Sequence, residues 1–169
     1  MSERMTIAQA LRRVKKLKGL VAEHTERARA GVSYVNTEVP AFRFADEVKA
    51  LTDTTQEMID LEAKIAVSNA TATVSYGDKE LNLAQAIRTL QELKGLIAFY
   101  KGLHLKSGTE KVRTSDWDDD LGKTINRVEE TTYVSDLSEQ DRDQIVKDMQ
   151  DRFEALNNTV EDANHQVLV

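Results

Sequence analysis

The stretch LNLAQAIRTLQELKGLIA at residues 81–98 decides the fold, because nearly the same string, MTIAQALRRVKKLKGLVA, occupies residues 5–22. At a constant offset of 76, the fifteen positions that begin at Ala8 and at Ala84 share nine identities. Three of the six remaining differences exchange one apolar side chain for another. The chain therefore contains an internal duplication.

Both copies are predicted to be amphipathic helices. Their apolar residues recur every three or four positions, as on one face of a helix. Each copy also opens with a capping-box signature, since Thr6 precedes Gln9 by three residues and Asn82 precedes Gln85 by three. The duplication thus includes the helix start, and the second copy is expected to end near Lys106.

Two further helices are predicted, one between the copies and one after them. Apolar spacing places the first at about 45–69, and Ser138 is a good N-cap for a last helix that runs to about 164. Their final residues, IAVSN at 65–69 and VEDAN at 160–164, align at an offset of 95. We expect a mainly α fold of duplicated helical hairpins, with four long helices.

The links between these helices contain extended segments. GVSYVNTEVPAFRF at 31–44 alternates apolar and polar residues around its proline, Gly77 and Asp78 form a turn signal, and strands are predicted near 110–115 and 124–134. These are short β-hairpin excursions from a helical body. The whole chain, 1–169, is expected to be a single helical domain of two related halves, about 1–75 and 76–169.

The composition favours a helix-rich protein of the cytoplasm. The chain is 40% hydrophobic and 31% charged, with one proline and no cysteine, so disulfides and thiolate chemistry are excluded. No apolar run approaches the roughly 18 residues of a membrane span, and the first residues do not resemble a signal peptide. If a phage encodes the protein, the expected location is the host cytoplasm.

Charge alternates along the chain. Residues 1–30 carry a net +5 and residues 84–115 a net +4, whereas 31–83 sum to −5 and 116–169 to −10. Basic helices beside acidic ones can compensate each other, or the two basic segments can converge on an anion. The acidic total and the lack of aromatic residues among the basic ones disfavour nucleic-acid binding.

Gly19 and Gly95 occupy matching positions in the middle of the two related helices, where glycine costs about 1 kcal/mol relative to alanine. A close approach by another group at each glycine would offset this loss of helix stability. The same faces carry basic side chains. The candidate ligand-binding residues are Arg12, Lys15, Lys18, Gly19, Arg88, Lys94 and Gly95.

Two explanations of this small, basic face stay open, and they can coexist. One is a helix–helix contact, within the chain or between subunits. The other is a phosphate-bearing or planar ligand that lies over the glycines and is neutralised by arginine and lysine.

No catalytic or metal site is predicted, and no cofactor. The three histidines are far apart in sequence, and His24 and His104 fall on or beside apolar stripes, as packed structural histidines do. DWDDDLGKT at 116–124 does not fit a calcium loop, because its glycine is at the fifth position instead of the sixth. It does not fit a phosphate-binding loop either, because Trp117 stands where the first glycine must be, so we predict an acidic hairpin tip.

Three segments together resemble an uncharacterised small helical family of bacteria and phages, whose members sometimes carry the label septicolysin. They are QALRRVKKLKGL, IAVSNATATVSYGDKELNLAQAIRTLQELKGLIA and YVSDLSEQDRDQIVKDMQDRFEALNNTVEDANHQ. The family's I-N-x-T-N element appears as 65–69, its glycine turn and following helix as 78–88, and its last helix end as 160–164. The family's terminal tryptophan and an Arg-Asp pair are missing. The resemblance implies a helical, oligomeric protein and no established reaction.

The leading hypothesis is a non-enzymatic homo-oligomer that sequesters a small anionic, nucleotide-like ligand in basic pockets between helices. The phage association of the resembling family extends this to a sponge for a host immune signalling molecule. The alternative is a structural or assembly protein without a small-molecule ligand. A third hypothesis is an enzyme that uses carboxylates of the second and fourth helices.

Overall fold

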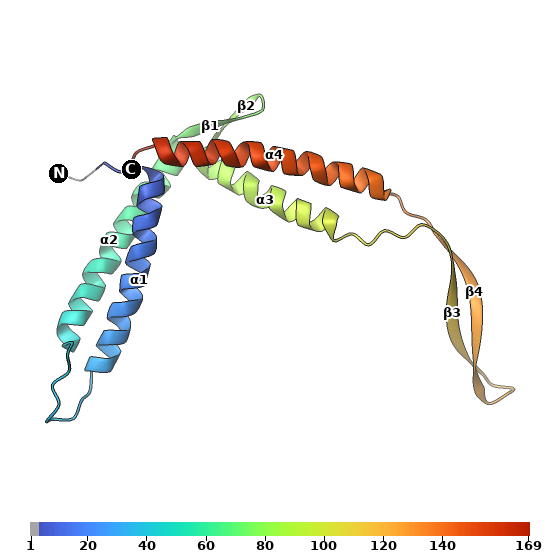
Figure 1. Ribbon diagram of the computed structural model, residues 1–169, viewed down its shortest axis with the longest axis horizontal. Helices are drawn as coiled ribbons and strands as arrows, with labels where there is room; N and C mark the ends of the chain where they lie inside the picture. Colours follow the sequence, from blue (N-terminus) through green and yellow to red (C-terminus); the bar gives the residue numbers. More distant parts are fainter. Residues whose placement is uncertain (1–3) are drawn as a thin grey trace. The chain divides into compact units, whose positions relative to one another are not determined.

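The structure is a computed structural model that describes residues 4–169 (Figure 1). Four helices alternate with two pairs of strands, in the order α1 (Ile7–Gly31), α2 (Phe44–Thr71), β1 (Thr73–Tyr76), β2 (Lys79–Asn82), α3 (Leu83–Lys101), β3 (Gly108–Asp118), β4 (Lys123–Tyr133) and α4 (Glu139–Gln166). The predicted mainly α fold with β-hairpins in the connections is confirmed.

The strands form two separate antiparallel hairpins. β1 pairs with β2 around the predicted turn at Gly77, whose φ is +58°, and β3 pairs with β4 over eleven residues each. The predicted acidic tip is the turn between β3 and β4, where the Asp118 carboxylate accepts hydrogen bonds from the amides of Asp120 and Leu121, both at 3.0 Å.

Two details differ from the sequence-based expectation. The α1–α2 link at residues 32–43 forms turns and bends and no strand. Helix α3 ends at Lys101, five residues before the expected end at Lys106. Gly102 follows it, and its amide makes the last helical hydrogen bond, to the carbonyl of Ala98 at 3.0 Å. The helix ends there because glycine has a low helix propensity.

Capping boxes fix both related helix starts. In α1, Thr6 N donates to Gln9 Oε1 at 2.9 Å and Gln9 N donates to Thr6 Oγ1 at 3.3 Å. In α3, the reciprocal pair joins Asn82 and Gln85 at 3.1 and 2.8 Å. Ser138 caps α4, since its Oγ accepts from Asp141 N at 3.0 Å. All three signatures were predicted from sequence.

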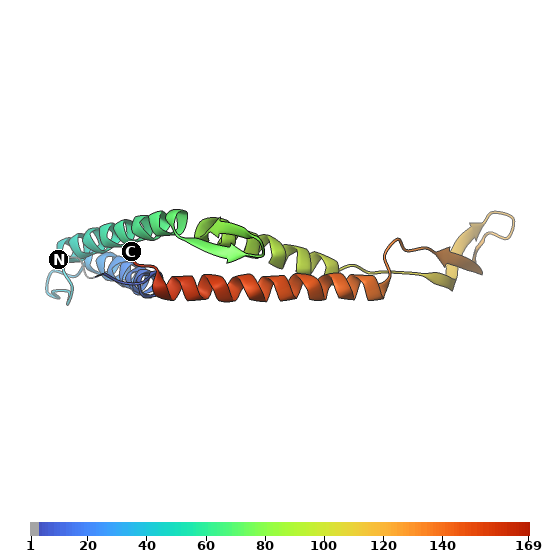
Figure 2. The same cartoon turned by 90° about the horizontal axis from the view of Figure 1, so that it is seen from above.

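The chain divides into two compact units. Unit 1 comprises the residues up to Gln91 together with Glu154–Val169, and unit 2 is Glu92–Phe153. Unit 1 therefore draws on both of the sequence halves expected at 1–75 and 76–169. Within it, α1 and α2 run side by side in both views (Figures 1 and 2).

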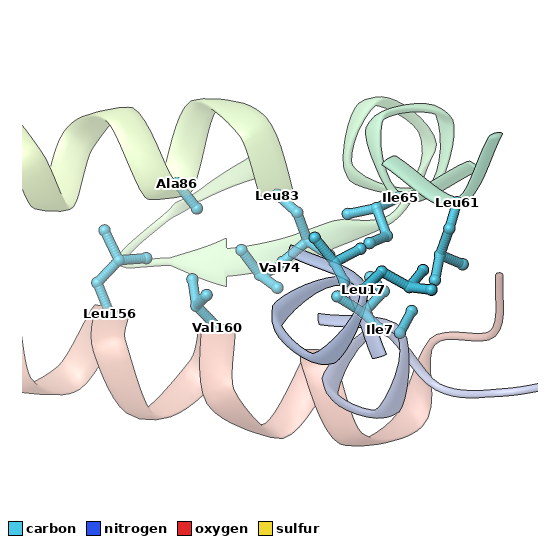
Figure 3. Packing of buried hydrophobic residues seen from close by; sticks show 11 residues of the cluster. Ile7, Leu17, Leu61, Ile65, Val74, Leu83, Ala86, Leu156 and Val160 are labelled. Carbon is cyan, nitrogen blue, oxygen red and sulfur yellow. The ribbon is translucent and has the colours of Figure 1, made fainter. Parts of the chain in front are cut away.

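The hydrophobic core of unit 1 gathers the ends of all four helices and strand β1 (Figure 3). Ile7, Leu83 and Leu156 are its largest fully buried side chains, each at most 1% exposed. The other buried members are Ala10, Val14, Leu17, Leu61, Ile65, Val74, Ala86 and Val160. The apolar residues that recur along the predicted helices supply most of this core. Leu11, which is one of them, is instead 47% exposed.

The two chain ends close this core with a short antiparallel bridge. Ile7 N donates to Val167 O at 3.0 Å, and Val169 N donates to Met5 O at 2.9 Å. Val167 and Val169 also pack against the core cluster. Sequence patterning gave no signal for this pairing, because each segment is only a few residues long.

Unit 2 has almost no core of its own. Among the described residues, its one buried apolar side chain is Val146 of α4, at 7% exposure. Arg142 Nη1 donates to the carbonyl of Leu103 at 3.4 Å, and the Lys106 ammonium lies 4.8 Å from the centre of the Tyr133 ring. Through these polar contacts, α4 and strand β4 bind the loop that follows α3.

Leu156→Ala tests the core of unit 1. We expect a loss of about 2 to 5 kcal/mol in the free energy of unfolding, because the substitution leaves a cavity at a fully buried site. Leu11→Ala is the matched control, and it should cost under about 1 kcal/mol. Urea denaturation followed by circular dichroism measures both, and equal losses would contradict the assigned core.

Candidate functional site

The basic face of α1 carries four of the predicted site residues. Arg12, Lys15 and Gly19 follow one another at spacings of three and four, so they share one exposed face, and Lys18 lies beside them. Arg12 Nε donates to the carbonyl of Ala8 at 3.3 Å. The helix thus presents a row of exposed cationic groups next to a residue without a side chain.

Neighbouring carboxylates engage part of this positive charge. Lys18 Nζ lies 2.9 Å from Glu62 Oε1 of α2, and Arg13 pairs with Glu57 on the same helix. Lys15 makes no ion pair with any residue of the described range 4–169. Basic α1 beside acidic α2 is the compensation that the charge pattern allowed.

Helix α3 carries the other three predicted residues, divided between the two units. Arg88 belongs to unit 1, whereas Lys94 and Gly95 belong to unit 2, and both of the latter are exposed. The Arg88 guanidinium donates to Gln91 Oε1 at 3.4 Å. Arg88 and Gly95 are seven residues apart, as are Arg12 and Gly19, so the two helices repeat the same arrangement of arginine and glycine.

Arg88 also lines a shallow hollow of about 550 Å³ at the start of α3. Its other lining residues are Leu81, Asn82, Ala84, Gln85 and Thr89. One cation, two amide side chains and a hydroxyl are groups that bind an oxyanion. Arg88 is thus a predicted site residue that also lines a hollow.

Neither repeated glycine is used for packing within its own unit. A Cβ atom added at Gly19 or at Gly95 would meet no other atom within 4 Å. The close approach that would offset the helix cost of glycine is therefore not supplied by an intramolecular contact around either residue. Both glycines are exposed and have open space beside them.

The structure adds two features that the sequence did not mark as sites. One is a hollow of about 400 Å³ at the end of the α1–α2 pair, lined by Tyr34, Pro40, Phe44 and their neighbours. The Arg27 guanidinium lies 4.2 Å from the centre of the Phe42 ring nearby. The alternating apolar residues of the α1–α2 link were the sequence signal that could have pointed to this hollow, but they were interpreted as an extended segment.

The other feature is the pair of His24 and Glu47. His24 Nδ1 lies 2.7 Å from Glu47 Oε2, and Glu47 is the buried charged residue of the described chain, at 8% exposure. The pair joins α1 to α2, which agrees with a structural role for this histidine.

One exposed lysine has a shifted pKa. Asp53 accepts a hydrogen bond from Lys49 Nζ at 2.5 Å, which raises the pKa of this exposed lysine and keeps it protonated. Within residues 4–169, no cluster of three His, Asp or Glu side chains could hold a metal ion. In the same range, no helix is both long and apolar enough to cross a membrane.

Comparisons with known proteins place the fold and not the activity. No family model matches the chain, and no curated protein matches it either. A solved structure of a functionally unknown conserved protein from Corynebacterium diphtheriae is similar, with a TM-score of 0.68, 14% identity and coverage of 99% of both chains. The fold thus exists in an experimentally determined protein.

Gly19→Ala tests the open space at the glycine. With no ligand and at protein concentrations low enough to prevent association, we expect stability to rise by about 0.5 to 1 kcal/mol, because alanine favours the helix and its methyl group meets nothing. Gly31→Ala is the control: its Cβ would lie 2.7 Å from the Phe42 carbonyl oxygen and should destabilise the protein. Thermal unfolding measures both, and a destabilised Gly19→Ala protomer would refute the open environment.

Glu47→Ala should lower the free energy of unfolding by about 1 to 3 kcal/mol, because it leaves the partly buried His24 without its partner. Asp53→Ala removes a carboxylate from an exposed pair on the same helix and should leave the free energy of unfolding nearly unchanged. The comparison uses urea denaturation at neutral pH. Similar small effects for both would show that the His24–Glu47 contact does not hold α1 to α2.

Proposed function

We propose that the protein is a non-enzymatic homo-oligomer that sequesters a small anionic, nucleotide-like ligand on its glycine-bearing basic helices. The observation that carries the proposal is the repeated, unoccupied glycine. Gly19 and Gly95 each have open space where a side chain would be, and each follows an arginine of the same helix by seven residues. A phosphate-bearing ligand or a second protomer would fill that space.

The ligand site of the proposal uses residues of both related helices. Arg12, Lys15 and Lys18 would bind phosphate oxygens beside Gly19, and Arg88 and Lys94 would do so beside Gly95. Arginine suits this role because its planar guanidinium binds two oxygens of one phosphate at once. The hollow beside Arg88 supports the α3 side of the site.

The same proposal covers the origin and setting of the protein. Two hairpins that descend from one ancestral helix pair would make a single domain of related halves, with matching capping boxes at Thr6 and Asn82. Through the resemblance to the septicolysin-labelled family of bacteria and phages, the ligand would be a host immune signal and the protein a phage sponge in the host cytoplasm.

The alternative is an assembly protein without a small-molecule ligand, and a specific observation favours it. Several large apolar side chains are exposed at the end of the α1–α2 pair, including Tyr34 at 58%, Val39 at 74% and Phe42 at 44%. Unit 2 buries one apolar side chain among the described residues, Val146. Surfaces of this kind are typical of protein–protein contacts.

Ligand-induced stabilisation separates the two functions. The proposal expects one of a panel of phosphate-bearing probes, such as ATP, ADP-ribose and cyclic dinucleotides, to stabilise the protein at low salt. At one hundred times its Kd the gain would be about 2.7 kcal/mol. Arg12→Ala and Arg88→Ala should each weaken binding about tenfold or more, whereas Arg29→Ala, on the same helix as Arg12, should leave it unchanged.

The assembly alternative makes the opposite set of expectations. No probe stabilises the protein, Gly19→Leu reduces the native mass, and Arg12→Ala leaves the mass unchanged. Differential scanning fluorimetry together with light scattering distinguishes these outcomes. A protein that is neither stabilised by any probe nor larger than 19.0 kDa would contradict both functions.

A further inference from the structure

The β3–β4 ribbon lacks the support that such a structure needs. Its eleven-residue strands pair from Gly108–Tyr133 to Asp118–Lys123 as a sheet of two strands, and no residue of either strand is buried. Isolated two-stranded hairpins are marginally stable in water, and a third strand or a packed face is required for stability. In this two-stranded sheet each strand has one long edge with no neighbouring strand among the described residues.

The β4 edge matches itself across a two-fold axis. In an antiparallel pair of identical strands related by an axis normal to the sheet, facing residues are equally spaced about one central residue. The centre of β4, Lys123–Tyr133, is Val128. With Val128 facing Val128 of a second copy, Arg127 faces Glu129 of that copy and Glu129 faces its Arg127.

The rest of this register is also compatible. Moving outward, Ile125 faces Thr131 of the second copy and Thr124 faces Thr132, which are pairs of β-branched side chains. At the ends, the Lys123 ammonium faces the Tyr133 ring. The register uses every residue of the strand and places no two like charges opposite each other.

The groups that would make these contacts are unused within the chain. Across the ribbon, Arg127 of β4 faces Thr114 of β3, and Glu129 of β4 faces Val112 of β3. Neither Arg127 nor Glu129 forms an ion pair within residues 4–169. Val128 is 61% exposed. By contrast, the neighbouring Glu130 already faces Lys111 across the ribbon, at 3.9 Å.

Charge also selects against the competing arrangements. Moving the two-fold axis by one residue sets Arg127 against Arg127, or Glu129 against Glu129, and like charges directly opposite are destabilising. Pairing the β3 edge about its own centre sets Arg113 against Arg113 and Glu110 against Asp116. The β3 edge is therefore protected from self-pairing, as free sheet edges usually are.

We propose that the β4 edges of two copies pair antiparallel about Val128, which makes a four-stranded sheet in the order β3-β4-β4-β3. This inference specifies one contact of the homo-oligomer in the proposed function and is independent of the ligand. It supplies the third strand that the ribbon lacks, and the two symmetric Arg127–Glu129 contacts set its register.

Charge exchange at Arg127 and Glu129 tests the inference on the full-length protein. Arg127→Glu and Glu129→Arg each convert two attractive contacts into two repulsive ones, so the dissociation constant of the β4–β4 contact should rise about 10- to 100-fold. The double variant Arg127→Glu/Glu129→Arg restores complementarity and should recover the wild-type value. Arg113→Glu changes the same charge on the opposite edge and is the matched control, with no expected effect.

An equimolar mixture of the two single variants gives a second test, because all four facing charges are then attractive and the mixed pair should form. Sedimentation velocity over a concentration series measures every mass, and circular dichroism verifies the helices. Single variants that keep the wild-type mass, or a double variant that does not recover it, would overturn the β4–β4 contact. Such results would not contradict self-association through another surface. A wild-type protein that stays at 19.0 kDa would overturn the oligomer of the proposed function as well.

Discussion

The contact on which unit 1 depends is the meeting of four helix ends around Ile7, Leu83 and Leu156. Two capping boxes start α1 and α3 at defined residues, so the first apolar side chain of each helix enters this core at a fixed place. The last turns of α2 and α4 supply Ile65 and Val160. Outside this core, α1 and α2 still pack along each other, whereas α3 has no further buried residue.

That limited burial has a direct consequence for function. A helix pair or a two-stranded ribbon has too few layers to enclose its own apolar side chains. Here the exposed glycines, the apolar residues of the α1–α2 link and the β4 edge all lie outside the core. The glycines have open space beside them, several apolar residues of the link are exposed and no residue of β4 is buried, and for these reasons we propose a protein that works as an assembly.

Much of the fold could be predicted from sequence because its signals are local. Helical periodicity, the capping residues Thr6, Asn82 and Ser138, and the turn at Gly77 all act over a few residues, and the structure has helices and hairpins at those places. The early end of α3 at Lys101, the bridge between the chain ends and the His24–Glu47 pair depend on packing between distant segments. Periodicity carries no information about them.

The candidate site was predictable only as a set of residue types. Spacing places Arg12 and Gly19 on one helix face, and the structure agrees, but it also shows that Glu62 pairs with Lys18, which no pattern along the sequence could indicate. The division of Arg88 from Lys94 and Gly95 between two compact units was equally invisible. Sequence repeats identify equivalent residues, and they do not reveal what those residues contact.

The central claim is that another copy of the chain covers surfaces that this chain leaves open. Hydrogen–deuterium exchange of residues 123–133, compared between wild-type protein and the Arg127→Glu variant, tests it most directly. The account predicts slower exchange of β4 amides in the wild type, with β3 amides unchanged at their free edge. Equal exchange of β4 in both proteins would contradict it.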